Sequence, residues 1–497
     1  MEKRKTRLSN PCDGCSLRRE QIRQDQGSQQ SPDNSDNTGS GQPPQSPLSI
    51  CASHHIRQRR RSQSSDGNAP LDSSSGNVGH SKSQLPLWLY IKYLERFRDC
   101  LISVWPIVDI DSLVARLIKH SPEDYEAFAL AGAVCATVIA QLRLSQLRLS
   151  KQHRSSPDIS AIAESFARHA QHIRDQHSYR ESESTDSLLI AFFLHIYFAN
   201  TERIRAGAMY LHEAIAQLSL QKLHRPETFK HLPGDQRELM LRIFWLVFVT
   251  ERTFCVQNGF PTCLSPIHTW PSEEYQVFGL GGLDSSFQLL AKIFTLLDDN
   301  LLMPGDRLVP KSGTHTADNL YQSLSAMAES PVSAIGPTLP ELQRVNVMVT
   351  WNWIRILWWQ YALRHYRMSS SIDDTMLSML GPASIANQTV RLFASVSQQA
   401  IQTHGYGMEL KIFRIADSLV DLLTCNRRLP SSPQPSSSML LGARDTLHAL
   451  ENALVLVGGQ GSFFYEKLQL FMAEVQLPVA NIRTLPFGRE VTVGDEV

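Results

Sequence analysis

The chain has 497 residues, with 48 Lys and Arg against 48 Asp and Glu, and eight cysteines scattered along its length. The length allows a large core or two to three domains, and the balanced charge excludes a bulk electrostatic attraction to nucleic acid or membrane. Scattered cysteines exclude a secreted disulfide scaffold and indicate a reducing compartment. The apolar runs 127–140 and 188–200 are shorter than the about 20 residues that cross a bilayer. We therefore expect no signal peptide and no membrane span.

Residues 1–24 hold a cysteine pair in a basic setting. Cys12 and Cys15 have the C-x2-C spacing of a zinc half-site. Basic residues stand on both sides of the pair, among them Lys5, Arg7, Arg18 and Arg19. Thiolates suit zinc, but a structural zinc ion takes four ligands, so the pair alone cannot complete a site. Cys51 and His54 could supply the missing two across a polar loop, although coincidence is the better interpretation of that spacing.

Residues 25–85 consist mainly of Ser, Gln, Asn, Asp, Gly and Pro and contain no aromatic side chain. Such a segment buries too little apolar surface to offset its ordering entropy, which predicts a disordered linker. Within it lies a basic run of Arg57, Arg59, Arg60 and Arg61. The run is either a solvated charged segment or a nuclear-localisation or phosphate-contacting element, and we favour the second reading.

From residue 86 to residue 497 the apolar residues recur with helical spacing, and strand-like alternation is scarce. The pattern predicts one large all-α domain. The expected helices are 87–103, 111–119, 125–149, 159–175, 186–200, 202–218, 234–257, 287–302, 341–368, 381–402, 411–426 and 440–456. In the helix 341–368, Trp351, Ile354 and Trp358 have i, i+3, i+7 spacing and should face the core, whereas Trp353 and Trp359 are less certain.

The stretch 205–273 has a distinctive order of segments. It contains Ala206-Gly-Ala-Met-Tyr-Leu-His-Glu-Ala-Ile-Ala, then Leu220-Gln-Lys-Leu-His, then Arg237-Glu-Leu-Met-Leu-Arg-Ile-Phe-Trp, and finally Asn258-Gly-Phe-Pro. Phe244, Trp245 and Phe248 should form one apolar face. On the same helix Arg242 and Arg252 can pair with acidic neighbours, namely Glu238 and Glu251.

These segments resemble the middle homology region of fungal binuclear zinc cluster transcription factors, where related helices and a G-R-P turn follow in this order. The resemblance covers about residues 87–305. Met240 and Leu241 replace two arginines of the family pattern, Glu251 replaces its aspartate, and Phe260 replaces the arginine of its turn. We therefore identify residues 86–497 with the family's helical regulatory domain.

The resemblance also implies a role for the cysteine pair in binding zinc. In this family six cysteines hold two zinc ions, and basic residues on a short helix read a CGG triplet. Arg18 and Arg19 occupy that position, but Ile22 stands where the third cysteine should be. Residues 1–24 are thus a remnant or truncated DNA-binding region. Either the cluster has degenerated, or residues from about 20 to 60 include a wrongly translated intron.

The resemblance implies a nuclear transcription regulator of metabolic genes, most plausibly a secondary-metabolite gene cluster and otherwise carbon-source use. No heptad repeat follows the basic run, so the coiled coil of many relatives is missing, and a homodimer or a heteromeric partner stays open. The alternatives are an interaction protein that does not bind DNA and, remotely, an all-α enzyme or ligand receptor.

No enzyme signature supports the last alternative. His212-Glu213 begins like a zinc-protease motif, but Ala216 replaces the second histidine. His195 lies in the apolar run 188–198, and we expect it to be a core histidine rather than a catalytic one.

Overall fold

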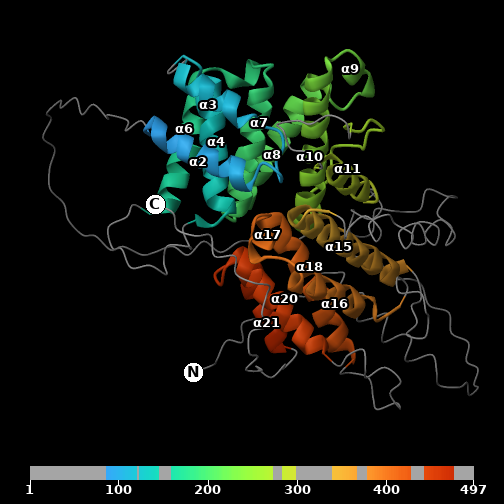
Figure 1. Cartoon of the computed structure of the whole chain (residues 1–497). Helices are drawn as coiled ribbons and strands as arrows, with labels where there is room; N and C mark the ends of the chain where they lie inside the picture. The colour runs from blue at the N-terminus through green and yellow to red at the C-terminus, as the bar shows by residue number, and fades with distance from the viewer. Residues whose placement is uncertain are drawn as a thin grey trace, which may run out of the picture. The chain divides into compact units, whose positions relative to one another are not determined.

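The computed structural model describes residues 85–119, 123–144, 158–272, 283–297, 339–365, 378–426 and 442–474. All these residues belong to one compact unit of the chain (Figure 1). Within the described ranges every element is a helix, which confirms the expected all-α fold class. No helix in these ranges has the length and apolarity needed to cross a bilayer.

The N-terminal helices pack around two central members. They are α2 (Leu87–Cys100), α3 (Ile110–Lys119), α4 (Tyr125–Gln141), α6 (Ile159–Gln176), the 3-10 turn η1 (Tyr179–Glu181), α7 (Thr185–Asn200) and α8 (Ile204–Leu220). Helix α4 packs against α2, α6 and α7, and α7 also packs against α8. Because α4 and α7 are apolar on all sides, they lie in the core rather than at its edge, as the two apolar runs predicted.

Local signals set the ends of these helices. Asp124 caps α4 by accepting a hydrogen bond from the backbone N–H of Ala127 at 3.0 Å, and Ser184 caps α7 through Ser187 at 3.1 Å. Gly132 allows α4 to approach α6, because a Cβ there would lie 3.1 Å from the backbone oxygen of Phe166. The predicted helix 125–149 is interrupted after Gln141, where Arg143 takes a left-handed φ of 48°, and its residues 145–149 lie outside the described ranges.

The next helices are α9 (Pro226–Lys230), α10 (Gly234–Asn258) and α11 (Leu283–Phe294). Phe244, Trp245 and Phe248 are fully buried, but α10 does not present a single apolar face. Its charged residues Glu238, Arg242, Glu251 and Arg252 are buried as well.

Buried charges on α10 have polar partners. Glu251 lies 3.6 Å from Arg252 and accepts the backbone N–H groups of Cys263 and Leu264, while Arg252 donates to the Leu264 carbonyl at 2.8 Å. Glu238 accepts the backbone N–H of Ser272 at 2.7 Å. The charged side of α10 therefore fixes the chain that follows it, instead of facing water.

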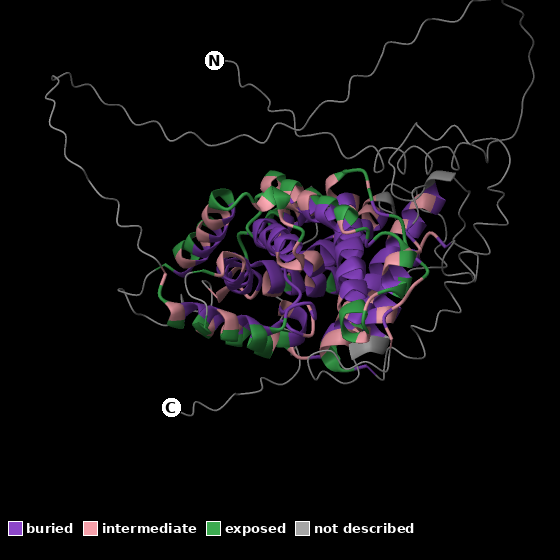
Figure 2. Ribbon diagram, turned by 90° about the horizontal axis from the view of Figure 1, so that it is seen from above, coloured by how far each residue is buried: buried purple, intermediate pink, exposed green. Residues whose placement is uncertain are grey.

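The C-terminal helices form a second packed group. They are α15 (Glu341–His365), α16 (Gly381–Ala394), α17 (Gln398–Gln402), α18 (Tyr406–Asn426), α20 (Ala443–Gly458) and α21 (Phe463–Glu474). Helix α18 packs against α15, α16, α20 and α21, and α15 also contacts α11. Figure 2 shows the buried residues concentrated along the inner helices.

Two expectations about this group change. Trp351, Ile354 and Trp358 are buried as predicted, but Trp353 and Trp359 are buried too, so α15 has core on both sides. The predicted helix 381–402 is two helices, because Ser397 caps a new one through the N–H of Ala400 and binds Glu341. Helices α9 and α21 were not predicted.

Candidate functional site

The residues expected to contact zinc or DNA lie outside the described part of the chain. They are Cys12, Cys15, Cys51, His54, Lys5, Arg7, Arg18, Arg19, Arg57, Arg59, Arg60 and Arg61. The disordered linker predicted over residues 25–85 lies outside it as well, except for Leu85. In the described ranges no group of three or more His, Cys, Asp or Glu side chains could hold a metal ion. A two-zinc cluster does not fit this chain, because only Cys12 and Cys15 have the required spacing.

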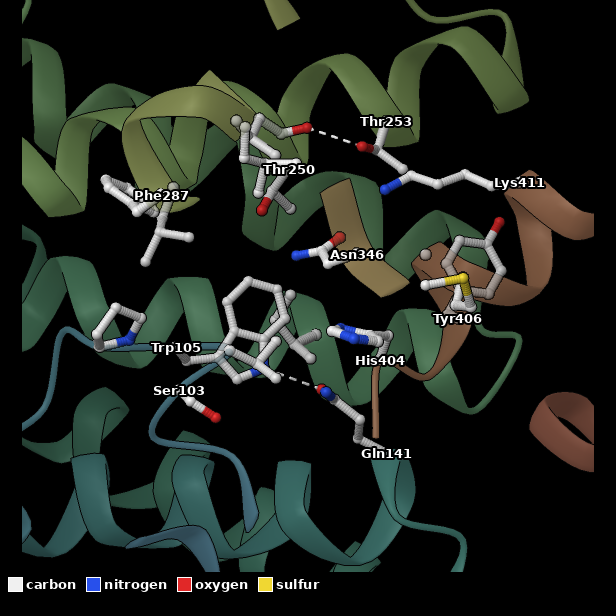
Figure 3. Close-up of a pocket in the computed structure, with 18 of the residues that line it drawn as sticks. Ser103, Trp105, Gln141, Thr250, Thr253, Phe287, Asn346, His404, Tyr406 and Lys411 are labelled. Atoms are coloured by element: carbon white, nitrogen blue, oxygen red, sulfur yellow. Dashed lines mark hydrogen bonds between the residues drawn. The ribbon is translucent and has the colours of Figure 1, made fainter. Parts of the chain in front are cut away.

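The structure instead contains a partly open pocket of about 110 Å³ in the helical domain (Figure 3). Its walls come from the turn after α2, the end of α4, and α7, α10, α11, α15 and α18. The apolar part of the lining includes Leu246, Phe254, Phe287, Leu290, Val347 and Met408. Buried polar side chains complete the wall, which is the usual composition of a site for a small molecule.

Polar contacts from α4 and α7 hold the turn that leads into α18. Gln141 donates to the Thr403 carbonyl at 2.7 Å, and the Asn200 side-chain oxygen accepts the backbone N–H of Tyr406 at 2.9 Å. Gly405 has a φ of 58°, and a Cβ there would lie 2.5 Å from that oxygen of Asn200. Glycine is therefore required at this position. The turn places His404, Tyr406 and the start of α18 at the pocket.

Further polar groups line the opposite walls. The Trp105 indole donates to the Gln141 side chain at 3.1 Å, which fixes both at the pocket rim. Thr253 uses its hydroxyl within α10, donating to the Val249 carbonyl at 2.9 Å. Figure 3 shows the Asn346 amide between Thr250 and His404, directed into the open space. The amide of Asn346 thus offers a ligand both a donor and an acceptor.

Lys411 is the unusual residue of the pocket. Its side chain is 5% exposed, and its ammonium donates to the Thr350 hydroxyl at 2.8 Å. The ammonium also lies 5.4 Å from the ring centre of Phe294 and 5.8 Å from that of Trp353, which are cation–π distances. Burial lowers the pKa of Lys411 from 10.5 to about 7. No described carboxylate forms a salt bridge with it.

Two buried histidines also line the pocket. His195 hydrogen-bonds the Gly207 carbonyl at 2.9 Å, and His404 bonds the Leu342 carbonyl at 3.1 Å. Burial lowers the pKa of each to about 4, so both are neutral near pH 7. The expectation that His195 is a core histidine is confirmed, although it also contributes to the pocket wall.

The lining is basic. Among the described lining residues, Lys411 and Arg242 are cationic, the two histidines are neutral, and none is an aspartate or glutamate. This imbalance favours an anion inside the pocket.

Sequence reasoning missed Lys411, His404 and Asn346 as site residues. One signal was available for Lys411, which stands between Leu410 and Ile412 in a mostly apolar helical stretch. A lysine in such a position is rarely buried without a reason. Nothing comparable marks Asn346, whose role depends on helices brought together only by the fold.

Comparisons with known proteins find a matching domain model and several relatives. Residues 94–269 match the model of the fungal specific transcription factor domain. The chain is 25% identical over 338 residues to the Probable sucrose utilization protein SUC1 of Candida albicans, covering 66% of this chain and 63% of that protein. It thus spans less than two thirds of this relative's length.

Two relatives from Saccharomyces cerevisiae have similar coverage. The Respiratory transcription factor ZNF1 is 25% identical over 71% of this chain and 72% of its own length. The Maltose fermentation regulatory protein MAL13 is 22% identical over 68% of this chain and 69% of its own length. The domain match lies within the region 87–305 for which the sequence motifs indicated this resemblance. Residues 94–269 therefore match the fungal specific transcription factor domain, and about two thirds of the chain resemble proteins named as a respiratory transcription factor and a maltose fermentation regulatory protein.

Proposed function

We propose that this chain acts in the nucleus and regulates the transcription of genes for carbon-source use. The observation that carries the proposal is its similarity, over 66% to 71% of the chain, to proteins named for sucrose utilization, respiration and maltose fermentation. The pocket lined by Lys411 and Arg242 supports it, because a regulator of metabolic genes needs a place to sense a small molecule.

In this proposal the basic N-terminal residues contact DNA. Arg18 and Arg19 stand where the family's recognition helix would contact guanine, while Lys5 and Arg7 can bind phosphates. Arg57, Arg59, Arg60 and Arg61 act as a nuclear-localisation signal or as further phosphate contacts. Without the remaining thiolates, sequence recognition would come from a partner chain, so the regulator works in a homodimer or with a heteromeric partner.

The proposal is tested by deleting the gene and sequencing transcripts after a shift from glucose to sucrose, maltose or a non-fermentable carbon source. We expect a set of carbon-source genes to lose its induction and reintroduction of the intact gene to restore it. Unchanged carbon-source transcripts together with a silenced biosynthetic gene cluster would contradict the proposal. That outcome would favour the secondary-metabolite role, which remains a prediction from the sequence.

A further inference from the structure

The pocket has a size that limits its ligand. Its volume is about 110 Å³, whereas an engineered cavity of about 150 Å³ in another protein binds benzene, which has six heavy atoms. A ligand of about four to six heavy atoms therefore fits without rearrangement. Sucrose and maltose have roughly four times as many heavy atoms as benzene, so neither fits wholly within a volume of about 110 Å³.

The charge of the lining limits the ligand further. The hydrogen bond to Thr350 uses one of the three ammonium donors of Lys411, and no described carboxylate pairs with the others. Figure 3 shows the nitrogen end of Lys411 directed into the same space as Asn346. An acidic group entering the pocket would accept charge-assisted hydrogen bonds from a donor that is already dehydrated. The free-energy cost of dehydrating the ammonium is already incurred when the domain folds. It therefore lowers the stability of the domain but does not lower its affinity for an acid.

The rest of the wall distinguishes a carboxylate from a phosphate. Phe254, Phe287, Leu290 and Val347 provide apolar surface that suits a short carbon chain. A phosphate dianion would leave most of its oxygens against this surface without donors, which is unfavourable. A hydroxyl or keto oxygen beside the carboxylate could reach the amide of Asn346 or the hydroxyl of Thr250.

We propose that this pocket binds a monocarboxylic acid of two to four carbons, with the carboxylate paired to Lys411 and a keto or hydroxyl oxygen facing Asn346. The acid would be a signal of metabolic state rather than the sugar itself. Binding of the acid stands on the pocket alone, and its effect on gene control rests on the proposed function.

The test is isothermal titration of the purified full-length chain with acetate, pyruvate and L-lactate. We expect millimolar or tighter binding of pyruvate or L-lactate, weaker binding of acetate, and none of glycerol or maltose. Lys411→Met should weaken the affinity at least about 30-fold, as expected for losing a hydrogen-bonded charge. Lys292→Met, at an exposed lysine of α11, should leave the affinity unchanged.

A second variant keeps the proposal testable if Lys411→Met fails to fold. Asn346→Leu keeps the side-chain volume but removes the amide donor and acceptor that would contact the ligand. It should weaken the affinity for pyruvate more than the affinity for acetate. Several outcomes would overturn the proposal: no binding of any of the three acids, equal affinity in Lys411→Met, equal affinity for glycerol, or binding of inorganic phosphate alone. Transcript changes on sugar shift would test the proposed function separately, since the titration contains no DNA.

Discussion

At the scale of a single residue, Lys411 is a buried charged group that lowers the stability of the fold that contains it. Its pKa is 10.5 when exposed and about 7 in the folded domain, because burial disfavours the ammonium. The penalty grows as the pH falls from 10.5 to 7 and is constant below that, where both states are charged. At pH 7 the shift corresponds to a loss of on the order of 4 kcal/mol in the free energy of unfolding.

Lys411→Met should therefore stabilise the ligand-free chain. We expect a gain of about 1–4 kcal/mol at pH 7, reduced by the lost hydrogen bond to Thr350. The gain should shrink as the pH rises toward 10, because the wild-type lysine then loses its charge in both states. Denaturant unfolding at pH 7 and pH 9.5 measures this, with Lys292→Met as the exposed control. A destabilised Lys411→Met at both pH values would mean that the lysine is a structural group.

His404 gives a pH dependence of the same sign over a lower pH range, since its pKa is also lowered by burial. Burial, opposed by the bond to the Leu342 carbonyl, lowers its pKa from 6.5 to about 4. Its contribution is fully present above pH 6.5 and is lost as the pH falls toward 4, because the unfolded state binds the proton first. Between pH 8 and pH 5 this amounts to about 2 kcal/mol.

His404→Gln keeps a hydrogen-bonding side chain but cannot titrate. Between pH 8 and pH 5 the free energy of unfolding of the variant should fall by about 2 kcal/mol less than that of the wild type, as measured by chemical unfolding. His268→Gln, at an exposed histidine, should follow the wild type. Parallel curves for wild type and His404→Gln would refute this explanation of the acid sensitivity.

At the scale of elements, α10 joins the fold to the pocket. Trp245 on this helix is fully buried, stacks on Trp270 with ring centres 4.3 Å apart, and donates to the Thr269 carbonyl at 3.0 Å. The neighbouring residues Leu246, Thr250 and Thr253 line the pocket. The packing of Trp245 against the chain after α10 therefore supports the wall.

Trp245→Ala should lower the free energy of unfolding by roughly 3–5 kcal/mol, the usual cost of emptying such a core position. The loss of the hydrogen bond adds to this cost. Trp88→Ala is the matched control, since Trp88 is 63% exposed. Thermal and denaturant unfolding of the two variants should differ clearly. Equal stabilities would mean that the core around α10 repacks.

Helices were predictable because their signals are local. Apolar spacing placed the starts of the predicted helices 125–149 and 186–200 within one residue of those of α4 and α7. The end of α7 was also predicted correctly, whereas the end of α4 was not, since it depends on Gln141 and Arg143 binding the distant residues Thr403 and Glu409. Helix periodicity cannot reveal contacts over such separations.

The pocket was not predictable for the same reason. Its lining comes from segments between Ser103 and Lys411 that meet only after the helices pack. The family could still be inferred, because it depends on the order of segments such as those around Trp245 and not on their contacts. The charges on α10 were expected to pair with one another; Glu251 does lie near Arg252, but Glu238 and Glu251 also bind backbone N–H groups of the chain that follows the helix, which the sequence did not reveal.

At the scale of the whole molecule, the proposed regulation requires the helical domain and the N-terminal region to act together on the same genes. The domain carries the pocket, and the basic residues that we predict to contact DNA lie before residue 62. The net charge is zero, so any affinity for DNA must come from these local clusters and not from the chain as a whole. Their contribution is electrostatic, because Cys12 and Cys15 alone cannot build the two-zinc core that would present a recognition helix.

The full-length chain alone should bind DNA weakly, with little preference for CGG triplets and a steep dependence on salt. Each phosphate contact from residues 3–7 or 57–61 adds about one unit to the slope of log affinity against log salt. Replacing Arg59, Arg60 and Arg61 by glutamine should reduce that slope by up to about three units and weaken all sequences equally. Fluorescence anisotropy with CGG and scrambled duplexes, together with zinc determination by mass spectrometry, measures both properties. Nanomolar, CGG-dependent binding at physiological salt with bound zinc would contradict the prediction, and it would mean that Cys51 and His54, or a second chain, complete the metal site.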